Sequence, residues 1–316
     1  MKPLLLRILL RIPKVLELES DKQTIQCLEE YFDYFRLNSP FQKFQLATPP
    51  IIPSSGRLGF EIEMENVPNM PSSPPLWYYN EDPSLRNHGA EIVSLPLPDK
   101  FIKPALYILR QFLTKIADKK PDFSWRTSVH VHCNVQELSG AQFLFLLRLY
   151  IVFEPLLYFF AGEQRQTNNF CVPLIGSSVD KILSQFFDTQ HISLRNLDVL
   201  WPKYAGLSVF RLKDLGTIEY RHLPGTTDLN RLLIWSNLIL SLYNSALLSN
   251  QKEIDAQILK LNSTSEYEKF FKLIFGTVIP WDNSYKSLME MGVVFTKHCC
   301  SSNMEQCIFP IKKLSI

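Results

Sequence analysis

Residues 59–65 read Gly-Phe-Glu-Ile-Glu-Met-Glu, and this stretch decides how the rest of the sequence is interpreted. Its acidic and apolar residues alternate, as they do in a β-strand whose successive side chains point to opposite faces of a sheet. Glu61, Glu63 and Glu65 should therefore share one face. Three neighbouring carboxylates repel one another. A solvated outer face would tolerate them, but a bound cation would remove the repulsion, and hard cations such as Mg²⁺ prefer carboxylate oxygens.

Two later stretches repeat this alternation. Residues 128–135 place His130 and His132 on a common face, and the sequence Thr-Ile-Glu-Tyr-Arg-His-Leu does the same for Glu219 and Arg221. Each pattern alone is weak, because two nearby histidines are common and a surface Glu–Arg pair contributes little stability. Together the three strands predict a sheet face that binds a divalent metal and a polyphosphate.

The rest of the chain mixes helices and strands without regular βαβ alternation, which favours an α+β domain with an antiparallel sheet. Ser139 is placed to cap an apolar helix, and Arg148, Glu154 and Pro155 within that helix indicate a buried element rather than a membrane span. Further strands are expected at 77–79, 91–95 and 206–210, and helices at 20–37, 99–117, 228–248 and from about 263 onward.

The composition is that of an ordinary globular protein. The 316 residues are 46% hydrophobic, and the formal net charge of +2 comes with no strongly basic block, which argues against a nucleic-acid partner bound by charge alone. The six cysteines form no CxxC pair, so we expect reduced thiols in a cytoplasmic protein with no membrane partner. A zinc site from Cys299, Cys300 and Cys307 is less favoured. The segment Met1–Ile12 is expected to be an element of the fold rather than a targeting segment.

Several motifs carry a more specific resemblance, and they occur in one order along the chain. They are Gly59–Glu65, Asp82–Leu85 followed by Gly89–Leu97, Ser128–His132, Arg165–Cys171, Lys203–Ser208, and Thr217–Leu223 followed by Gly225 and Thr226. In this order they resemble the motifs of the amidoligase family, which is related to glutamine synthetase and glutamate–cysteine ligase. Ser208 and Leu95 depart from the family pattern, at positions where Asn and Pro are common.

The resemblance implies a fold and a reaction. The fold would be α+β, a glutamine-synthetase-like antiparallel sheet with helices packed on one face. Residues 1–50 would be an N-terminal extension, 51–250 the amidoligase catalytic core and 251–316 a mostly helical C-terminal region. The enzyme would be an ATP-dependent, Mg²⁺-dependent carboxylate–amine ligase that forms an amide bond through an acyl phosphate.

The resemblance also implies roles for individual residues. The metal ligands would be Glu61, Glu63, Glu219 and His130. The catalytic residues would be Glu91, Arg221 and Arg165, with Arg221 stabilising the transferring phosphoryl group and Glu91 either binding metal or facing the amine. ATP would contact His130, Lys203, Arg221 and Asn169. His132 is a less certain ligand, Glu65 is as readily structural as ligating, and Trp77, Tyr79 and Trp125 are candidates for a pocket wall.

The substrates would be a small-molecule or peptide carboxylate and an amine, and an oligomer stays open. Two other functions fit the residues. One is a metal-dependent hydrolase, because His and carboxylate ligands also serve zinc. The other is a non-catalytic, ATP-binding descendant of the fold.

Overall fold

The computed structural model describes residues 57–68, 70–175, 177 and 201–299. The expected helix at 20–37, the segment Met1–Ile12, and Cys300 and Cys307 lie outside these residues. The described chain divides into two compact units. One unit holds residues 57–134 and 211–233, and the other holds the described residues of 135–210 and 234–299.

The strands form one six-stranded sheet in the order β2-β3-β1-β4-β6-β5. The pairings of β1 with β3 and β4, of β2 with β3, and of β4 with β6 are all antiparallel. The predicted antiparallel sheet in a mixed α and β fold is therefore confirmed. The strands are β1 (Leu58–Met64), β2 (Trp77–Glu81), β3 (Ala90–Ser94), β4 (Ser128–Asn134), β5 (Leu207–Ser208) and β6 (Thr217–Pro224).

The register of the sheet brings the polar residues of different strands onto one face. Glu61 lies opposite His130, and His132 lies opposite Glu219. On the other side of β1, Glu63 lies opposite Glu91 of β3. Residues that oppose each other in an antiparallel pair point to the same side of the sheet. The alternation seen in the sequence therefore gives a continuous polar surface across four strands.

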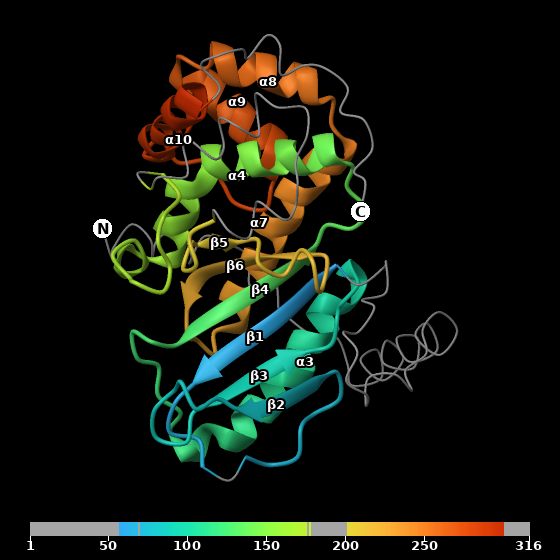
Figure 1. Cartoon of the computed structure of the whole chain (residues 1–316), viewed down its shortest axis with the longest axis vertical. Coiled ribbons are helices and arrows are strands. Elements are labelled where there is room, and N and C mark those ends of the chain that lie inside the picture. Colours follow the sequence, from blue (N-terminus) through green and yellow to red (C-terminus); the bar gives the residue numbers. More distant parts are fainter. Residues whose placement is uncertain (1–56, 69, 176, 178–200, 300–316) are drawn as a thin grey trace. The chain divides into compact units, whose positions relative to one another are not determined.

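The other face of the sheet is the apolar core of this unit. Phe60, Ile62 and Met64 have no exposed side-chain surface, and each such burial contributes roughly 2 kcal/mol to folding. Helix α3 (Asp99–Ile116) runs across this face (Figure 1). The indole Nε1 of Trp77 donates a hydrogen bond to the Ala105 carbonyl of α3 at 2.9 Å, which fixes the helix against the edge of the sheet.

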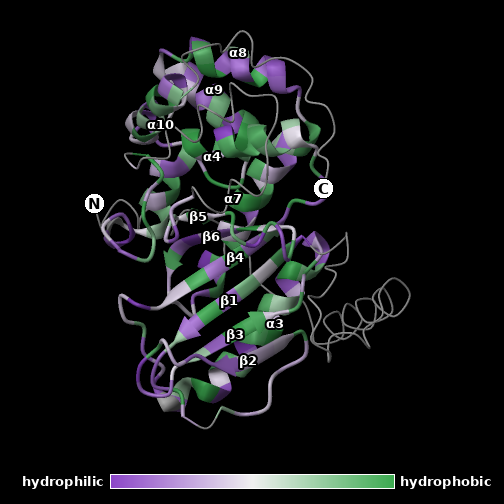
Figure 2. Cartoon of the chain, in the orientation of Figure 1, coloured by the Kyte–Doolittle hydropathy of each residue, from purple (hydrophilic) through white to green (hydrophobic). Residues whose placement is uncertain are grey.

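The second unit is built around helix α4 (Gly140–Ala161). Its N-terminus is a capping box, because Ser139 Oγ accepts from the Gln142 amide and Gln142 Oε1 accepts from the Ser139 amide. The helix is mostly hydrophobic, with a few polar interruptions (Figure 2). It is long and apolar enough to cross a membrane, but 94% of the apolar window is buried inside the protein, as the core helix of a globular unit would be. The sequence-based prediction of a capped, buried helix is confirmed.

The remaining helices follow the predicted order with one addition. Helix α10 packs closely on α4: a Cβ at Gly292 would lie 2.2 Å from the Val152 carbonyl oxygen, so this position requires glycine. The short helix α8 was not predicted as a separate element, and the pair Ser249-Asn250 separates it from α7. The helices are α7 (Leu229–Leu248), α8 (Gln251–Lys260), α9 (Thr264–Phe275) and α10 (Tyr285–Cys299).

Candidate functional site

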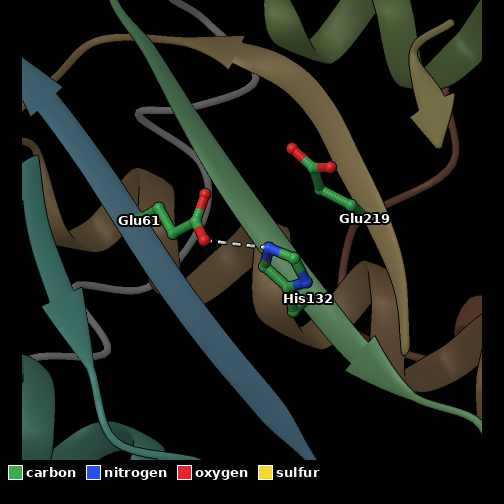
Figure 3. Close-up of side chains that lie close together, drawn as sticks. All are labelled: Glu61, His132 and Glu219. Carbon is green, nitrogen blue, oxygen red and sulfur yellow. Dashed lines mark ion pairs between the residues drawn. The ribbon is translucent and has the colours of Figure 1, made fainter. Parts of the chain in front are cut away.

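Three strands contribute to a tight cluster of carboxylates and imidazoles. His132 Nε2 lies 3.1 Å from Glu61 Oε1. His130 Nδ1 lies 3.3 Å from Glu61 Oε2 and 3.2 Å from Glu219 Oε1. Figure 3 shows Glu61 on β1, His132 on β4 and Glu219 on β6, with the ion pair between Glu61 and His132 drawn as a dashed line. Residues far apart in the sequence thus form one polar centre.

Two further carboxylates extend the cluster toward β3. Glu63 Oε2 accepts a hydrogen bond from the Ser128 amide at 2.7 Å, and its Oε1 lies 3.9 Å from His130 Nε2. Glu91 lies opposite Glu63 in the register and is partly exposed. The acidic surface therefore continues from the buried middle of the sheet toward its β2 edge.

The cluster shifts the pKa values of Glu61, His130 and His132. Burial disfavours the Glu61 carboxylate, but hydrogen bonds to both imidazoles outweigh it and hold the pKa of Glu61 well below its usual value. Burial and the Arg221 charge likewise disfavour an ionised His130, yet the surrounding carboxylates raise its pKa. Burial also opposes ionisation of His132, whose pKa is raised through Glu61. The carboxylates thus favour the charged form of both imidazoles.

The pKa values of Glu63 and Glu91 shift in the opposite direction from that of Glu61. Burial raises the pKa of Glu63. For Glu91, burial and then the negative charge of Glu61 raise the pKa to about 8. Each additional charge in the cluster is therefore costly, and a divalent cation would relieve that cost.

The donor atoms suit a metal ion in two overlapping groups. One group is Glu61, His132 and Glu219, and the other is Glu61, Glu91 and His130. Within each group one ligand atom per residue lies within 4.8 Å of the others. Both groups lie among the described residues, and both use Glu61. Carboxylate oxygens suit Mg²⁺ and Mn²⁺, and imidazole nitrogens add affinity for zinc and similar metals.

A guanidinium lies beside this centre. Arg221 Nη1 is 2.6 Å from Glu219 Oε1, so the predicted Glu219–Arg221 pair exists. An irregularity in the sheet lies beside this pair: Val129 pairs with Leu223 whereas Val131 pairs with Tyr220, which leaves one extra residue in β6. Bulges of this kind redirect side chains next to functional sites.

Other predicted residues of this unit have structural partners. Glu65 is buried and accepts a hydrogen bond from the Arg86 amide at 3.1 Å, so it anchors the loop that precedes β3. The side chains of Trp77 and Tyr79 point to the opposite face of the sheet and so cannot line the site. Trp77 belongs to the core beneath α3. Trp125 is 57% exposed, and the Arg126 guanidinium lies over its ring.

Three predicted residues belong to the other unit. Arg165 is 1% exposed, and Asn169 and Lys203 are exposed. The Lys203 Nζ atom lies 5.2 Å from the centre of the Tyr204 ring. Their roles in binding ATP or a carboxylate stay predictions.

Three residues at the site were given no role from the sequence, although Asp82 and Thr217 stand in the motifs quoted there. Thr217 Oγ1 lies 3.0 Å from His132 Nδ1. Asp82, on the loop after β2, is close enough for its charge to raise the pKa of Glu63 and Glu91. Tyr78 lies opposite Val93, which in turn lies opposite Glu61. The alternation of β2 would have identified Tyr78 only if the pairing of β2 residues with β3 residues had been known.

Comparison with known protein families gives a match. A family model whose description reads "Putative amidoligase enzyme" matches residues 18–243, which is more than two thirds of the chain. No curated protein matches the chain. The matched span includes every residue of the cluster described above, and it begins within the segment for which the motifs gave no match.

Proposed function

Because this chain belongs to the amidoligase family, we propose that it is an ATP-dependent, Mg²⁺-dependent ligase that joins a carboxylate to an amine. The single observation that carries the proposal is the cluster of Glu61, His130, His132 and Glu219 across three strands, with two overlapping groups of metal-binding atoms. Enzymes that transfer phosphoryl groups need cations where the phosphates bind. A relation to the glutamine-synthetase sheet is part of the proposal.

The metal-binding roles use the first group of donor atoms and the acids beside His130. Glu61 and Glu219 with His132 would hold one ion, and Glu61 with His130 and Glu63 the other, which leaves Glu91 for the amine. Bound Mg²⁺ supplies charge neutralisation for the ATP phosphates and makes the γ-phosphorus more electrophilic. Thr217 positions His132 through the hydrogen bond at Nδ1, which leaves Nε2 directed toward Glu61.

The proposed reaction has two steps. An oxygen of the substrate carboxylate attacks the γ-phosphorus of ATP, which gives an acyl phosphate and ADP. The substrate ammonium first gives one proton to the carboxylate of Glu91, and the neutral amine nitrogen then attacks the acyl carbon. The bond from that carbon to the phosphate oxygen breaks, and the nitrogen gives its second proton to the departing phosphate as the amide forms. Phosphate is a far better leaving group than oxide, which explains the need for ATP.

Two side chains are assigned to these steps. Arg221 stabilises the transferring phosphoryl group, since a guanidinium matches the geometry of phosphate oxygens. Glu91 faces the amine from its position on β3, on the side of the cluster toward the sheet edge. Arg165, Asn169 and Lys203 are proposed to bind phosphate or carboxylate groups, on the strength of the family motifs alone.

The second candidate function is a metal-dependent hydrolase. The observation that favours it is the presence of an imidazole in each group of donor atoms, because histidine is a preferred ligand of zinc. Metal analysis of the purified protein separates the two functions. Stoichiometric zinc that survives dialysis would favour the hydrolase, whereas reversible binding of Mg²⁺ or Mn²⁺ favours the ligase.

The test of the ligase is Mg²⁺-dependent release of ADP and phosphate from ATP, measured against a panel of amino acids and small carboxylates. Release that requires both a carboxylate and an amine, and that is lost in Glu61→Gln, is the expected result. Saturable binding of Mg²⁺ and ATP without turnover under any condition would indicate a non-catalytic descendant. Absence of both binding and turnover would contradict the proposal.

A further inference from the structure

Tyr78 lies in the same row of side chains as the metal-binding cluster. The cross-strand pairs join Tyr78 to Val93, Val93 to Glu61, and Glu61 to His130. All four side chains therefore lie on the site face. Adjacent strands are about 4.8 Å apart, so the backbone of Tyr78 lies roughly 10 Å from that of Glu61.

The exposure of Tyr78 sets it apart from its neighbours. Its side chain is 43% exposed, whereas Trp77, on the opposite face of the same strand, is 4% exposed and hydrogen-bonded to α3. Tyrosine is common in strands for its packing, but the Tyr78 ring is not enclosed by the core. It stands on an edge strand at the border of the polar face.

Acidic side chains lie near this ring on the site face. Glu61 stands in the same row as Tyr78, two strands away. In the next row Asn80 lies opposite Glu91, and Glu91 lies opposite Glu63. The surroundings of the ring thus offer carboxylate oxygens and an exposed carboxamide on the same face.

An aromatic ring beside carboxylates recognises a particular chemistry. The face of the ring attracts a cation, and the carboxylates add Coulomb attraction and accept N–H hydrogen bonds. A primary ammonium group satisfies all of these contacts. A phosphate or a second carboxylate would be repelled here.

We propose that the Tyr78 ring, with Asn80 and Glu91, forms the binding subsite for the amine substrate, which enters as a primary ammonium over the edge strand β2. This inference rests on the proposed ligase function and places one of its two substrates. It gives the face two parts: phosphates and metal over β1, β4 and β6, and the amine over β2 and β3. Tyr78 is then a specificity-determining residue.

The test uses ethylammonium as the probe, with 1-propanol as a neutral control of similar size. Binding of each to the full chain is measured by ligand-observed NMR in the presence of Mg²⁺ and a non-hydrolysable ATP analogue. The affinity for the ATP analogue is measured separately in every variant. The wild type should bind ethylammonium more tightly than 1-propanol. Tyr78→Leu should weaken ethylammonium binding at least about fivefold, with the affinity for the ATP analogue unchanged.

Two variants separate recognition from structure. Tyr78→Phe keeps the ring and should retain ethylammonium binding within about threefold of the wild type, because the ring face carries the attraction. Tyr79→Leu changes the neighbouring residue on the opposite face and should leave both ligands unaffected. Circular dichroism checks that each variant is folded.

The contrary outcomes are distinct. Equal ethylammonium binding by wild type and Tyr78→Leu, or no binding by the wild type while the ATP analogue binds, would overturn this inference and leave the proposed function intact. Loss of ATP-analogue affinity in Tyr78→Leu would also overturn it, in favour of a ring that stacks on the adenine base. Failure of the ATP analogue to bind the wild type would remove the proposed function itself.

Discussion

Glu154 and Glu61, one in each unit, show how the surroundings of a glutamate determine its role. Glu154 in α4 is 1% exposed, and its oxygens accept from the amides of Leu174 and Ile175 and from the Tyr150 hydroxyl, each at 2.7 Å. Glu61 is partly exposed, and its oxygens contact the imidazoles of His130 and His132. The first carboxylate has neutral partners fixed within its own unit, and the second has partners that can change their charge.

The contrast appears in the ionisation of the two groups. Burial raises the pKa of Glu154 to about 7 even though its hydrogen bonds favour the charged form. The pKa of Glu61 is held well below the usual range, because the hydrogen bonds and charges of the imidazoles overcome its burial. A carboxylate that neutral donors satisfy joins pieces of structure together. A carboxylate placed among imidazoles and other carboxylates has the donor atoms that could hold a metal ion.

The largest expected effect is the loss of turnover in Glu61→Gln. A carboxamide removes the negative charge shared by both groups of donor atoms, so Mg²⁺-dependent ADP release should fall by at least about 10²-fold. The matched control is Glu81→Gln, because Glu81 is an exposed glutamate outside the cluster. Normal turnover in folded Glu61→Gln, seen in a coupled ADP assay, would contradict the assignment.

The second effect falls on stability. Glu154→Ala removes the acceptor of a buried amide, a part-buried amide and a buried hydroxyl, and should lower the free energy of unfolding by roughly 3 kcal/mol. Urea denaturation followed by circular dichroism measures it. Glu154→Gln keeps one carbonyl oxygen and should cost less. If Glu154→Ala is as stable as the wild type, Glu154 is not the structural counterpart of Glu61.

A smaller effect is expected from the residue behind His132. Thr217→Val removes the hydroxyl at His132 Nδ1 without changing the shape of the side chain, and should weaken metal binding about tenfold. Calorimetric titration with Mn²⁺ measures this affinity. Thr217→Ser retains the hydroxyl and should bind like the wild type. Equal loss in both variants would show that packing, rather than the hydrogen bond, matters.

The smallest effect concerns pH in the metal-free protein. Glu91 has a pKa of about 8 when folded, against an ordinary 4.5, so between these values the folded chain holds a proton that the unfolded chain has released. The free energy of unfolding should therefore fall as pH rises through this window. The raised pKa values of His130 and His132 act in the same direction. In thermal melts across this range, Glu91→Gln should have a shallower slope, and an unchanged slope would contradict the shift.

The polar face could largely be predicted from the sequence because alternation is a local property. The glutamates of β1 and the histidines of β4 alternate with residues that a core must bury, so each strand could be oriented by itself. Glu65 continues the alternation but does not join the cluster. It accepts a hydrogen bond from the Arg86 amide instead, and the periodicity of the sequence does not predict this contact between strand and loop.

The register between strands could not be predicted in the same way. Strand β2 has aromatic residues at three successive positions, Trp77, Tyr78 and Tyr79, so hydropathy does not show which side faces the site. Only the pairing with β3 selects Tyr78. The extra residue of β6, between the pairs Val129–Leu223 and Val131–Tyr220, likewise has no signature in the sequence. The division into two units also depends on long-range contacts.

The place of β4 between β1 and β6 has a consequence for the order in which the protein is made. Residues 135–210 are synthesised after β4 and before β6, so the nascent chain carries Glu61, His130 and His132 well before Glu219 and Arg221 emerge. During that interval β4 is an unpaired edge whose residues are all buried in the finished sheet, and such edges promote aggregation. A chain cut short before β6 would lack part of the candidate site and be prone to aggregate. Arrival of β6 completes the candidate site and pairs this exposed edge in one event.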